Sequence, residues 1–305
     1  MEPAKKKQTI LIAAAVLVVI AIAGCAVLFS VLRGGSGAHG GDRGADSSIY
    51  IPPGEILVED IYEGQRLIPE FKIPVNEYDV KKFKKGENGY LTYDDGKAVL
   101  GVDVSEHQHE IDWVQVRDAG ISFAMLRLGN RGHTEGQLYT DETFEQNLLK
   151  AFGVGLDVGV YFFSQAVTEA EAVAEAEYVL EVLQGRSLQY PVVFDWEPPI
   201  PSEEIPAEDL RAYNCTGPQI SAFAKAFCQR VEQDGYTASV YTNKSMAYGT
   251  FDLELLKDYD LWYAEYQDAP SLYYNFRMWQ YTNEAEVPGI EGTVDLNICF
   301  EPYGD

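Results

Sequence analysis

From residue 98 onward, short apolar runs alternate with longer amphipathic segments along the chain. Continuous apolar runs of about four to eight residues, bounded by polar turns, are typical of strands that are buried on both faces. Such runs occupy residues 98–103, 123–128, 158–163, 191–195 and 237–241. Since each gap between them is long enough for a helix, this part of the chain predicts repeated strand–helix units.

The segments between these runs carry signals for helix starts and ends. Asp141 is expected to cap a helix that ends at Gly153. Thr168 and Glu171 have the spacing of a capping box, in which each side chain bonds the backbone of the other residue. Pro218 suits the first position of a third helix, where its missing N–H costs nothing. The helical segments therefore have defined starting points.

The pattern changes after about residue 258, where three more strands are expected with little helical sequence between them, at residues 261–265, 277–281 and 293–297. Five βα units followed by three strands predict an α/β fold, an irregular eight-stranded (β/α)-barrel of TIM-like type, over residues 98–305. Periodicity alone leaves a doubly wound open sheet as the alternative.

The N-terminus carries an uncharged apolar run at residues 9–32, long enough to cross a bilayer, which takes about 20 helical residues. Lys5, Lys6 and Lys7 precede it, so the positive-inside rule predicts a single-pass signal anchor, with residues 1–8 as a cytoplasmic tail and residues 33–305 outside the cell membrane. The sequence before Cys25 resembles a lipobox, so a lipoprotein anchored at Cys25 is the alternative. A cleaved signal peptide is a third reading, which the length of the run disfavours.

Residues 33–48 have the composition of a flexible Gly/Ser linker. Residues 49–97 are predicted to form a stalk and a β-rich extension, with a hairpin over residues 90–99 around the Asp95-Gly96 turn. Four lysines lie at positions 81, 82, 84 and 85. They are either a solvated face, which we favour, or a contact for an anionic wall polymer or lipid.

Charge and cysteine content exclude several classes of protein. Residues 98–305 hold 11 basic and 35 acidic side chains, a net charge of -24, so nucleic acid is excluded as a partner. Four cysteines do not make a disulfide scaffold, and helix geometry places Cys215 and Cys228 too far apart to bridge. The four histidines lack the spacing of a metal site, and we predict neither a metal ion nor another cofactor.

Acidic residues lie where three predicted strands end. Asp103 is in the first strand, Asp195 and Glu197 end the fourth, and Asp295 is in the last. Because strand side chains alternate, Asp195 and Glu197 share one face and Trp196 takes the other. Close carboxyl groups acquire different pKa values, as the acid and base of a glycosidase require. The alternative is that these acids cap loops or pair with Arg127 and Arg131.

Residues 99–303 resemble glycoside hydrolase family 25, the muramidases that cut peptidoglycan. The motifs are GVDVSEHQHEIDW (101–113), FAMLRLGNRG (123–132), VGVYFFSQA (158–166), YPVVFDWE (190–197), ASVYTN (238–243), LWYAEY (261–266), and MWQYT with VDLN (278–282, 294–297). The resemblance implies an irregular (β/α)-barrel that hydrolyses the β-1,4 bond between N-acetylmuramic acid and N-acetylglucosamine. Glycan strands of peptidoglycan would then be one partner, and the membrane, through the N-terminal helix, the other.

The resemblance also implies roles for individual residues. Glu197 matches the proton donor of the family and Asp195 its partner carboxylate, while Asp103 and Asp295 match the other acids of the cleft. Tyr161 and Gln280 match motif positions near the substrate.

Aromatic side chains at the motif strands suit the apolar faces of sugar rings. We expect Tyr241 and Tyr263, together with Tyr161, to line the cleft. Two other functions stay open from the sequence: a catalytically silent, membrane-anchored wall-binding module, and an anchored chitinase-like hydrolase. The first would be expected to lack Glu197 or Asp195, and both are present.

Overall fold

A computed structural model of the chain describes residues 50–303. The predicted cytoplasmic tail, signal anchor and linker, together with Cys25, lie outside the described residues. Among the helices of residues 50–303, none combines the length and the apolar character that crossing a bilayer requires.

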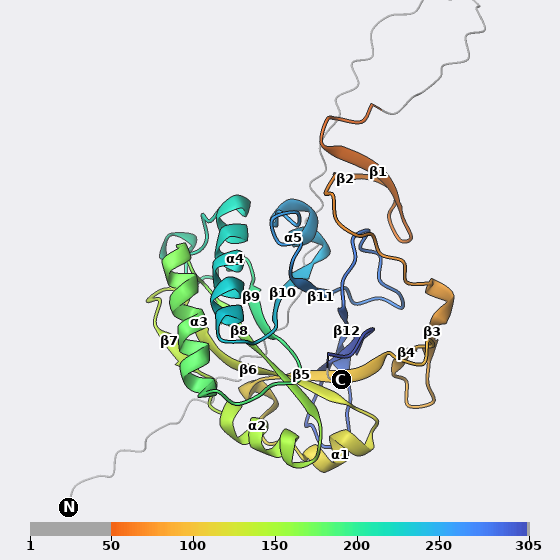
Figure 1. The fold of residues 1–305 in the computed structure, drawn as a ribbon, viewed down its shortest axis with the longest axis vertical. Coiled ribbons are helices and arrows are strands. Elements are labelled where there is room, and N and C mark those ends of the chain that lie inside the picture. Colours follow the sequence, from red (N-terminus) through yellow and green to blue (C-terminus); the bar gives the residue numbers. More distant parts are fainter. Residues whose placement is uncertain (1–49, 304–305) are drawn as a thin grey trace, which may run out of the picture. The chain divides into compact units, whose positions relative to one another are not determined.

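Eight strands close into a barrel (Figure 1). In their order around it they are β5 (Val99–Val104), β6 (Phe123–Arg131), β8 (Asp157–Ser164), β9 (Val192–Trp196), β10 (Ala238–Asn243), β11 (Asp260–Ala264), β12 (Met278–Ala285) and β13 (Val294–Cys299). Neighbours are parallel except that β13 runs antiparallel to both β12 and β5, and pairing of β5 with β6 completes the ring. A short strand, β7 (Leu138–Thr140), adds to β6 from outside the ring. The barrel prediction is confirmed, and the open sheet is excluded.

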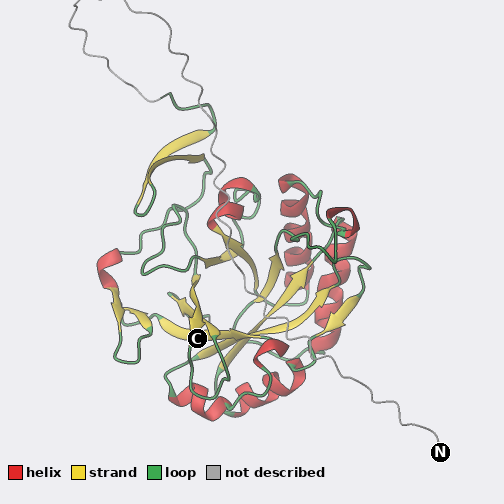
Figure 2. Cartoon of the chain, turned by 180° about the vertical axis from the view of Figure 1, so that it is seen from behind, coloured by secondary structure: helices red, strands yellow, loops and turns green. Residues whose placement is uncertain are grey.

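Five helices follow five of the strands and cover that part of the outside of the barrel (Figure 2). They are α1 (Trp113–Asp118), α2 (Phe144–Gly153), α3 (Glu169–Leu183), α4 (Gly217–Gln233) and α5 (Lys244–Gly249), so the predicted order of five βα units and three final strands is confirmed. Thr168 caps α3 by accepting a hydrogen bond from the Glu171 N–H at 3.1 Å, and Pro218 lies in the first turn of α4.

The predicted cap at Asp141 is wrong. Thr143 occupies the N-cap position of α2, and it makes no side-chain capping bond. The Asp141 carboxylate instead accepts hydrogen bonds from the backbone N–H groups of Thr143 and Glu106 and from Nε of Arg127. Arg127 and the Glu106 N–H occupy one carboxylate oxygen of Asp141 and Thr143 occupies the other, so the side chain makes no bond to the first turn of α2.

Two apolar clusters stabilise the fold, one inside the barrel and one between barrel and helices. Alternation along each strand assigns residues to one or the other. The inner cluster includes Phe123, and its ring leaves no space for a side chain on β5. A Cβ on Gly101 would lie 2.3 Å from that ring, so only glycine fits there.

Two hairpins precede the barrel, formed by β1 (Glu55–Asp60) with β2 (Gly64–Pro69) and by β3 (Phe83–Lys85) with β4 (Leu91–Tyr93). The prediction of a hairpin over residues 90–99 is therefore wrong, because β4, its expected first strand, pairs with the preceding strand β3. The Asp95-Gly96 turn instead links β4 to β5. The Asp95 carboxylate accepts hydrogen bonds from the backbone N–H groups of Lys97 and Ala98. Phe83 packs edge-on against Trp279 of β12, which joins this extension to the barrel.

Candidate active site

The four acids predicted from the sequence come together at one end of the barrel. Asp103 and Asp195 lie near the carboxyl ends of β5 and β9, and Glu197 directly follows β9. Asp295 reaches the same end because β13 is antiparallel, which places it opposite Asp103 in the β5–β13 register. One reversed strand thus adds a fourth carboxyl group to the face where barrel enzymes place their chemistry.

Polar side chains from neighbouring strands hold Asp103. Its Oδ2 accepts hydrogen bonds from Nε2 of Gln280 at 2.9 Å and from Nδ2 of Asn297 at 2.7 Å. Gln280 in turn accepts bonds through Oε1 from the hydroxyl groups of Tyr241 and Tyr266. Because Gln280 is both donor and acceptor, its orientation is fixed, and so is that of the Asp103 carboxylate.

Burial raises the pKa of every acid in the cluster. It raises that of Asp295 to about 9, and the neighbouring Asp103 charge adds to the shift. It also raises the pKa of Asp103, against the hydrogen bonds from Asn297 and Gln280. For Glu197 the causes are burial and then the Asp103 charge. For Asp195 burial comes first, followed by the charges of Glu197 and Asp103, with Arg127 opposing. The cluster therefore retains protons at neutral pH.

The two arginines of the alternative interpretation pair elsewhere. Arg127 contacts Glu106 and Asp141, each at 2.8 Å, and Arg131 contacts the buried Glu175 at 2.6 Å. The four acids are thus not their ion-pair partners. Within residues 50–303, no group of three or more His, Cys, Asp or Glu side chains is arranged to hold a metal ion. Cys215 and Cys228 are free thiols, in agreement with the helix geometry.

The Asp-x-Glu segment has the predicted alternation. Trp196 is buried in the outer cluster, on the opposite face from the acids. Asp195 is buried, and its Oδ1 has no hydrogen-bond partner among the described residues. Leaving a buried carboxylate oxygen unbonded is costly, so this atom is available to a donor on a bound molecule.

Aromatic side chains surround the acids inside the barrel. Tyr161 of β8 and Tyr241 of β10 both pack edge-on against Trp262, with ring centroids 5.8 and 5.0 Å apart. Tyr263, which we expected in the cleft, is fully buried in the outer cluster, where it packs against Phe276. That expectation is corrected: Trp262, one position earlier, faces the acids.

Three contributing residues were not predicted. Trp262 donates from Nε1 to Asn297 Oδ1 at 2.8 Å, which orients the amide that holds Asp103. Gln165 is fully buried and donates from Nε2 to the Glu197 carbonyl at 3.0 Å, fixing the backbone of that acid. Asn297 could have been found from the sequence, since it shares the face of Asp295 two positions away. Gln165 is in no strand that carries one of the acids, so its sequence position did not point to the site.

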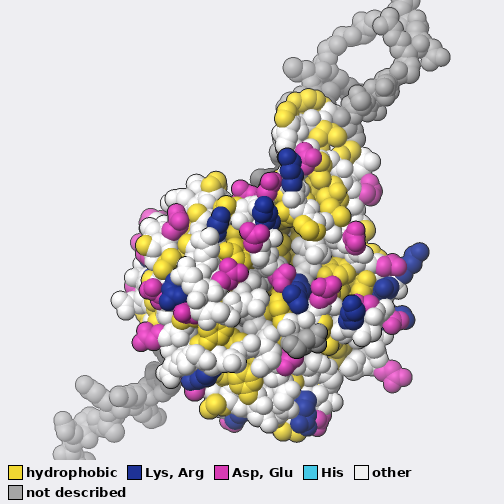
Figure 3. Space-filling model, viewed as in Figure 1, with side chains coloured by type: hydrophobic (Ala, Val, Ile, Leu, Met, Phe, Trp, Pro, Cys, Tyr) yellow, Lys and Arg dark blue, Asp and Glu magenta, His cyan; other side chains and the backbone are white. Residues whose placement is uncertain are grey.

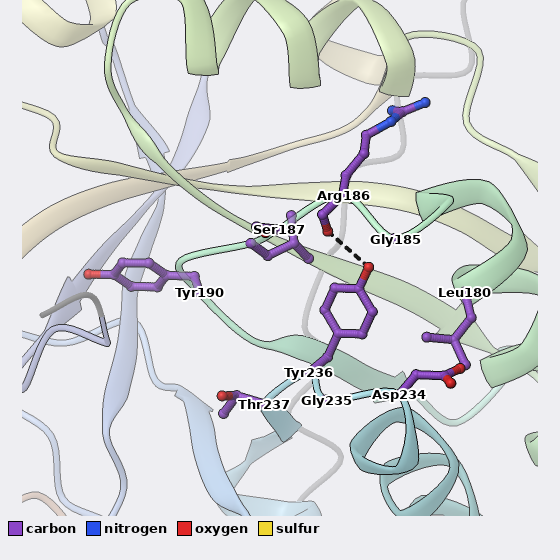
Figure 4. A pocket seen from close by; sticks show the side chains of 10 residues that line it. Leu180, Gly185, Arg186, Ser187, Tyr190, Asp234, Gly235, Tyr236 and Thr237 are labelled. Atoms are coloured by element: carbon purple, nitrogen blue, oxygen red, sulfur yellow. Dashed lines mark hydrogen bonds between the residues drawn. The ribbon is translucent and has the colours of Figure 1, made fainter.

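A pocket of about 470 Å³ lies at the other end of the barrel (Figure 4). Its lining includes Arg186, Asp234 and Tyr236, in the loops that lead into β9 and β10, and the Tyr236 hydroxyl donates to the Arg186 carbonyl. The acids follow or end those strands, whereas these residues precede them. This pocket is not part of the candidate active site.

The Asp295 pKa predicts a pH-dependent stability. The unfolded carboxyl group ionises near its ordinary pKa of 3.8, whereas the folded one keeps its proton up to about pH 9. The folded state therefore binds more protons in that interval, and its stability falls as pH rises. We expect Asp295→Asn, which cannot ionise, to gain several kcal/mol over wild type at about pH 8, with little difference below about pH 4.

Chemical denaturation across this pH range measures the effect. Asp258→Asn, at an exposed position, is the matched control and should change little. A stability difference for Asp295→Asn that stays constant with pH would contradict the prediction.

A closed (β/α)-barrel with paired carboxyl groups at the carboxyl ends of its strands has the two groups that the chemistry of a glycoside hydrolase requires. A family model described as "Glycosyl hydrolases family 25" matches residues 102–290, more than half of the chain. The chain belongs to glycosyl hydrolases family 25.

Individual relatives and solved structures are similar to this chain. Lysozyme M1 of Streptomyces globisporus is 26% identical over 211 residues, covering 67% of this chain and 68% of the relative. The solved lysozyme of Streptomyces coelicolor matches with a TM-score of 0.53 and 25% identity, over 68% of this chain and 94% of that one. The modular autolysin LytC of Streptococcus pneumoniae, solved with a synthetic peptidoglycan ligand, matches with a TM-score of 0.58 and 22% identity, over 82% of this chain and 57% of that one.

Proposed function

We propose that this chain is a muramidase that hydrolyses the β-1,4 bond between N-acetylmuramic acid and N-acetylglucosamine in bacterial peptidoglycan. The observation that carries the proposal is the Asp195–Glu197 pair at the end of β9, beside Asp103 and Asp295. Family membership and the similarity to two Streptomyces lysozymes support it. Both members of the pair are present, which disfavours a silent wall-binding module.

Glu197 is the general acid. It lies at the open end of the strand and is less buried than Asp195, so a leaving-group oxygen can approach it. Burial and the Asp103 charge raise its pKa, which keeps a transferable proton on the carboxyl group closer to neutral pH. The bond from Gln165 to its carbonyl holds the backbone that aims this carboxyl.

Asp195 stabilises positive charge on the sugar and orients the acetamido group. Its unpartnered Oδ1 is a ready acceptor for an acetamido N–H. In the free protein its pKa is raised, and both this hydrogen bond and the positive charge that develops during bond cleavage favour the ionised form. Binding of substrate therefore prepares Asp195 for its role.

Asp103 and Asp295 share a hydrogen bond that raises the pKa of Asp295 and lowers that of Asp103, so Asp295 is the member of the pair that holds the proton. The pair keeps one fixed charge state beside the catalytic acids, while Gln280 and Asn297 hold the Asp103 carboxylate in place. Tyr161 and Tyr241 present aromatic rings beside them, where pyranose faces and acetamido groups bind.

The proposal is tested by digesting purified peptidoglycan with the full-length chain and identifying the products by mass spectrometry. We expect fragments with N-acetylmuramic acid at the reducing end. Reducing N-acetylglucosamine would assign a different bond, and faster cleavage of chitin oligomers would favour a chitinase-like hydrolase. Binding to peptidoglycan with no release of reducing sugar would favour the silent module.

We also propose that residues 9–32 anchor the chain in the cell membrane as a single-pass helix, with the catalytic barrel outside. The support is the uncharged run of 24 residues after Lys5, Lys6 and Lys7. Intact-mass measurement of the membrane fraction should find the unprocessed chain. A lipidated N-terminal Cys25 would replace this proposal with a lipoprotein.

A further inference from the structure

The β1–β2 hairpin has no role in the mechanism above. It lies outside residues 102–290, which match the family. We call residues 60–64, which turn the chain from β1 into β2, the hairpin tip. In Figure 1 the hairpin lies beside α5, and Arg66 of β2 stacks over the Tyr248 ring of α5 at 4.9 Å.

One lysine attaches the hairpin tip to the barrel. Nζ of Lys244 contacts Asp60 at 2.9 Å, Glu63 at 3.1 Å and Glu265 at 2.9 Å. Lys244 directly follows β10 and Glu265 directly follows β11. The hairpin tip is therefore fixed at the carboxyl ends of these strands, the end of the barrel that carries the catalytic acids.

A second contact ties the hairpin tip to the loop that follows β11. The Tyr62 hydroxyl donates to the Ala269 carbonyl at 2.9 Å and accepts from the Ala269 N–H at 3.1 Å. The same loop carries Tyr266, whose hydroxyl donates to Gln280, and Gln280 donates to Asp103. One loop thus connects the hairpin tip to the side chains that hold Asp103.

The hairpin tip nevertheless leaves large apolar side chains in solvent. Ile61 is 52% exposed and Tyr62 is 44% exposed, although four polar contacts hold the side chains of Asp60 and Glu63 and the Tyr62 hydroxyl. Hydrophobic side chains are prominent on the hairpin in the space-filling view (Figure 3). A rigid pair of apolar and aromatic side chains binds a pyranose face with little loss of conformational entropy.

We propose that Ile61 and Tyr62 form a distal glycan-binding subsite, several sugars from the bond that is cut, and that it selects long glycan strands over short oligosaccharides. This inference rests on the proposed muramidase function, because it takes the occupant to be the same strand that reaches Glu197. Lys244 is a positioning residue that holds the subsite in line with the acids.

The test compares two substrates with the full-length chain: a peptidoglycan tetrasaccharide and long uncrosslinked glycan strands. The variants are Ile61→Ser, which leaves both anchoring contacts intact, and the double variant Ile61→Ser with Tyr62→Ser, which also removes the contact with Ala269. Tyr62→Phe loses that contact but keeps the ring, so it separates the loss of the anchor from the loss of the subsite. Leu149→Ser on α2, at a position 61% exposed, is the matched control. We expect the double variant to raise KM for long strands about tenfold, with kcat unchanged and tetrasaccharide cleavage as in wild type.

Three other outcomes would each contradict the inference, and each would point to a different explanation. Unchanged KM for long strands would show that the hairpin tip does not bind glycan. An equal loss on both substrates would assign the hairpin a structural role, and thermal unfolding of the variants would register it. A wild-type chain that cuts neither substrate would refute the proposed function, and the inference with it.

Discussion

Glu197→Gln should lower kcat on peptidoglycan by about 10²–10⁴-fold, the range that general acid catalysis supplies. Glutamine keeps the shape of the side chain and the approach of the leaving oxygen, but it has no proton to transfer. The fold should survive the change, since Glu197 is half-buried at the end of β9 and its backbone bond from Gln165 is retained. Burial and the Asp103 charge disfavour a charge on Glu197, and glutamine carries none.

Turnover of purified peptidoglycan, followed by release of reducing sugar, measures this loss. Glu204→Gln is the matched control, because Glu204 is an exposed glutamate in the loop that follows β9. It should keep wild-type activity. If Glu197→Gln folded normally and cleaved peptidoglycan at a rate near that of wild type, Glu197 would not be the general acid.

Asp195→Asn should lower kcat by about 10²–10³-fold, the loss typical of removing one electrostatic contact to the transition state. Asparagine can still accept a hydrogen bond from the acetamido group through its Oδ1, so KM should change little. What it lacks is the negative charge that stabilises the sugar cation. Asp209→Asn, at an exposed aspartate in the same loop, is the control.

The two acids act on the same transition state, so their effects should not be independent. The double variant Asp195→Asn with Glu197→Gln should lose less than the product of the single losses. Fully multiplicative losses would contradict a shared step. A large rise in KM with unchanged kcat for Asp195→Asn would assign Asp195 to substrate binding alone.

The order of elements could be predicted because its signals are local. Thr168 and Pro218 mark helix starts wherever the helix packs, and continuous apolar runs mark buried strands. The acids could be predicted for the same reason, since the period of two places Asp195 and Glu197 on one face and Trp196 on the other.

Tertiary structure alone decided which face of β11 is inside the barrel. Its residues Leu261 to Ala264 are all apolar, so alternation gives no indication of which side chains point inward. Trp262 faces the acids and Tyr263 faces the helices because the register with β10 and β12 sets the orientation of the strand. When a strand is buried on both faces, its sequence does not show which side chains point into the barrel and which point toward the helices.

Contacts between segments far apart in the chain could likewise not be predicted from the sequence. The pairing of β4 with β3 depends on packing against Trp279, and Asp141 binds Arg127 instead of capping its own helix. Lys244 meets Asp60 across 184 positions. The sequence determined the elements, their order and the residues able to do chemistry, because turns, caps and periodicity act over a few residues. Only the closed barrel decided which of those residues meet, because such contacts depend on the packing of the whole chain.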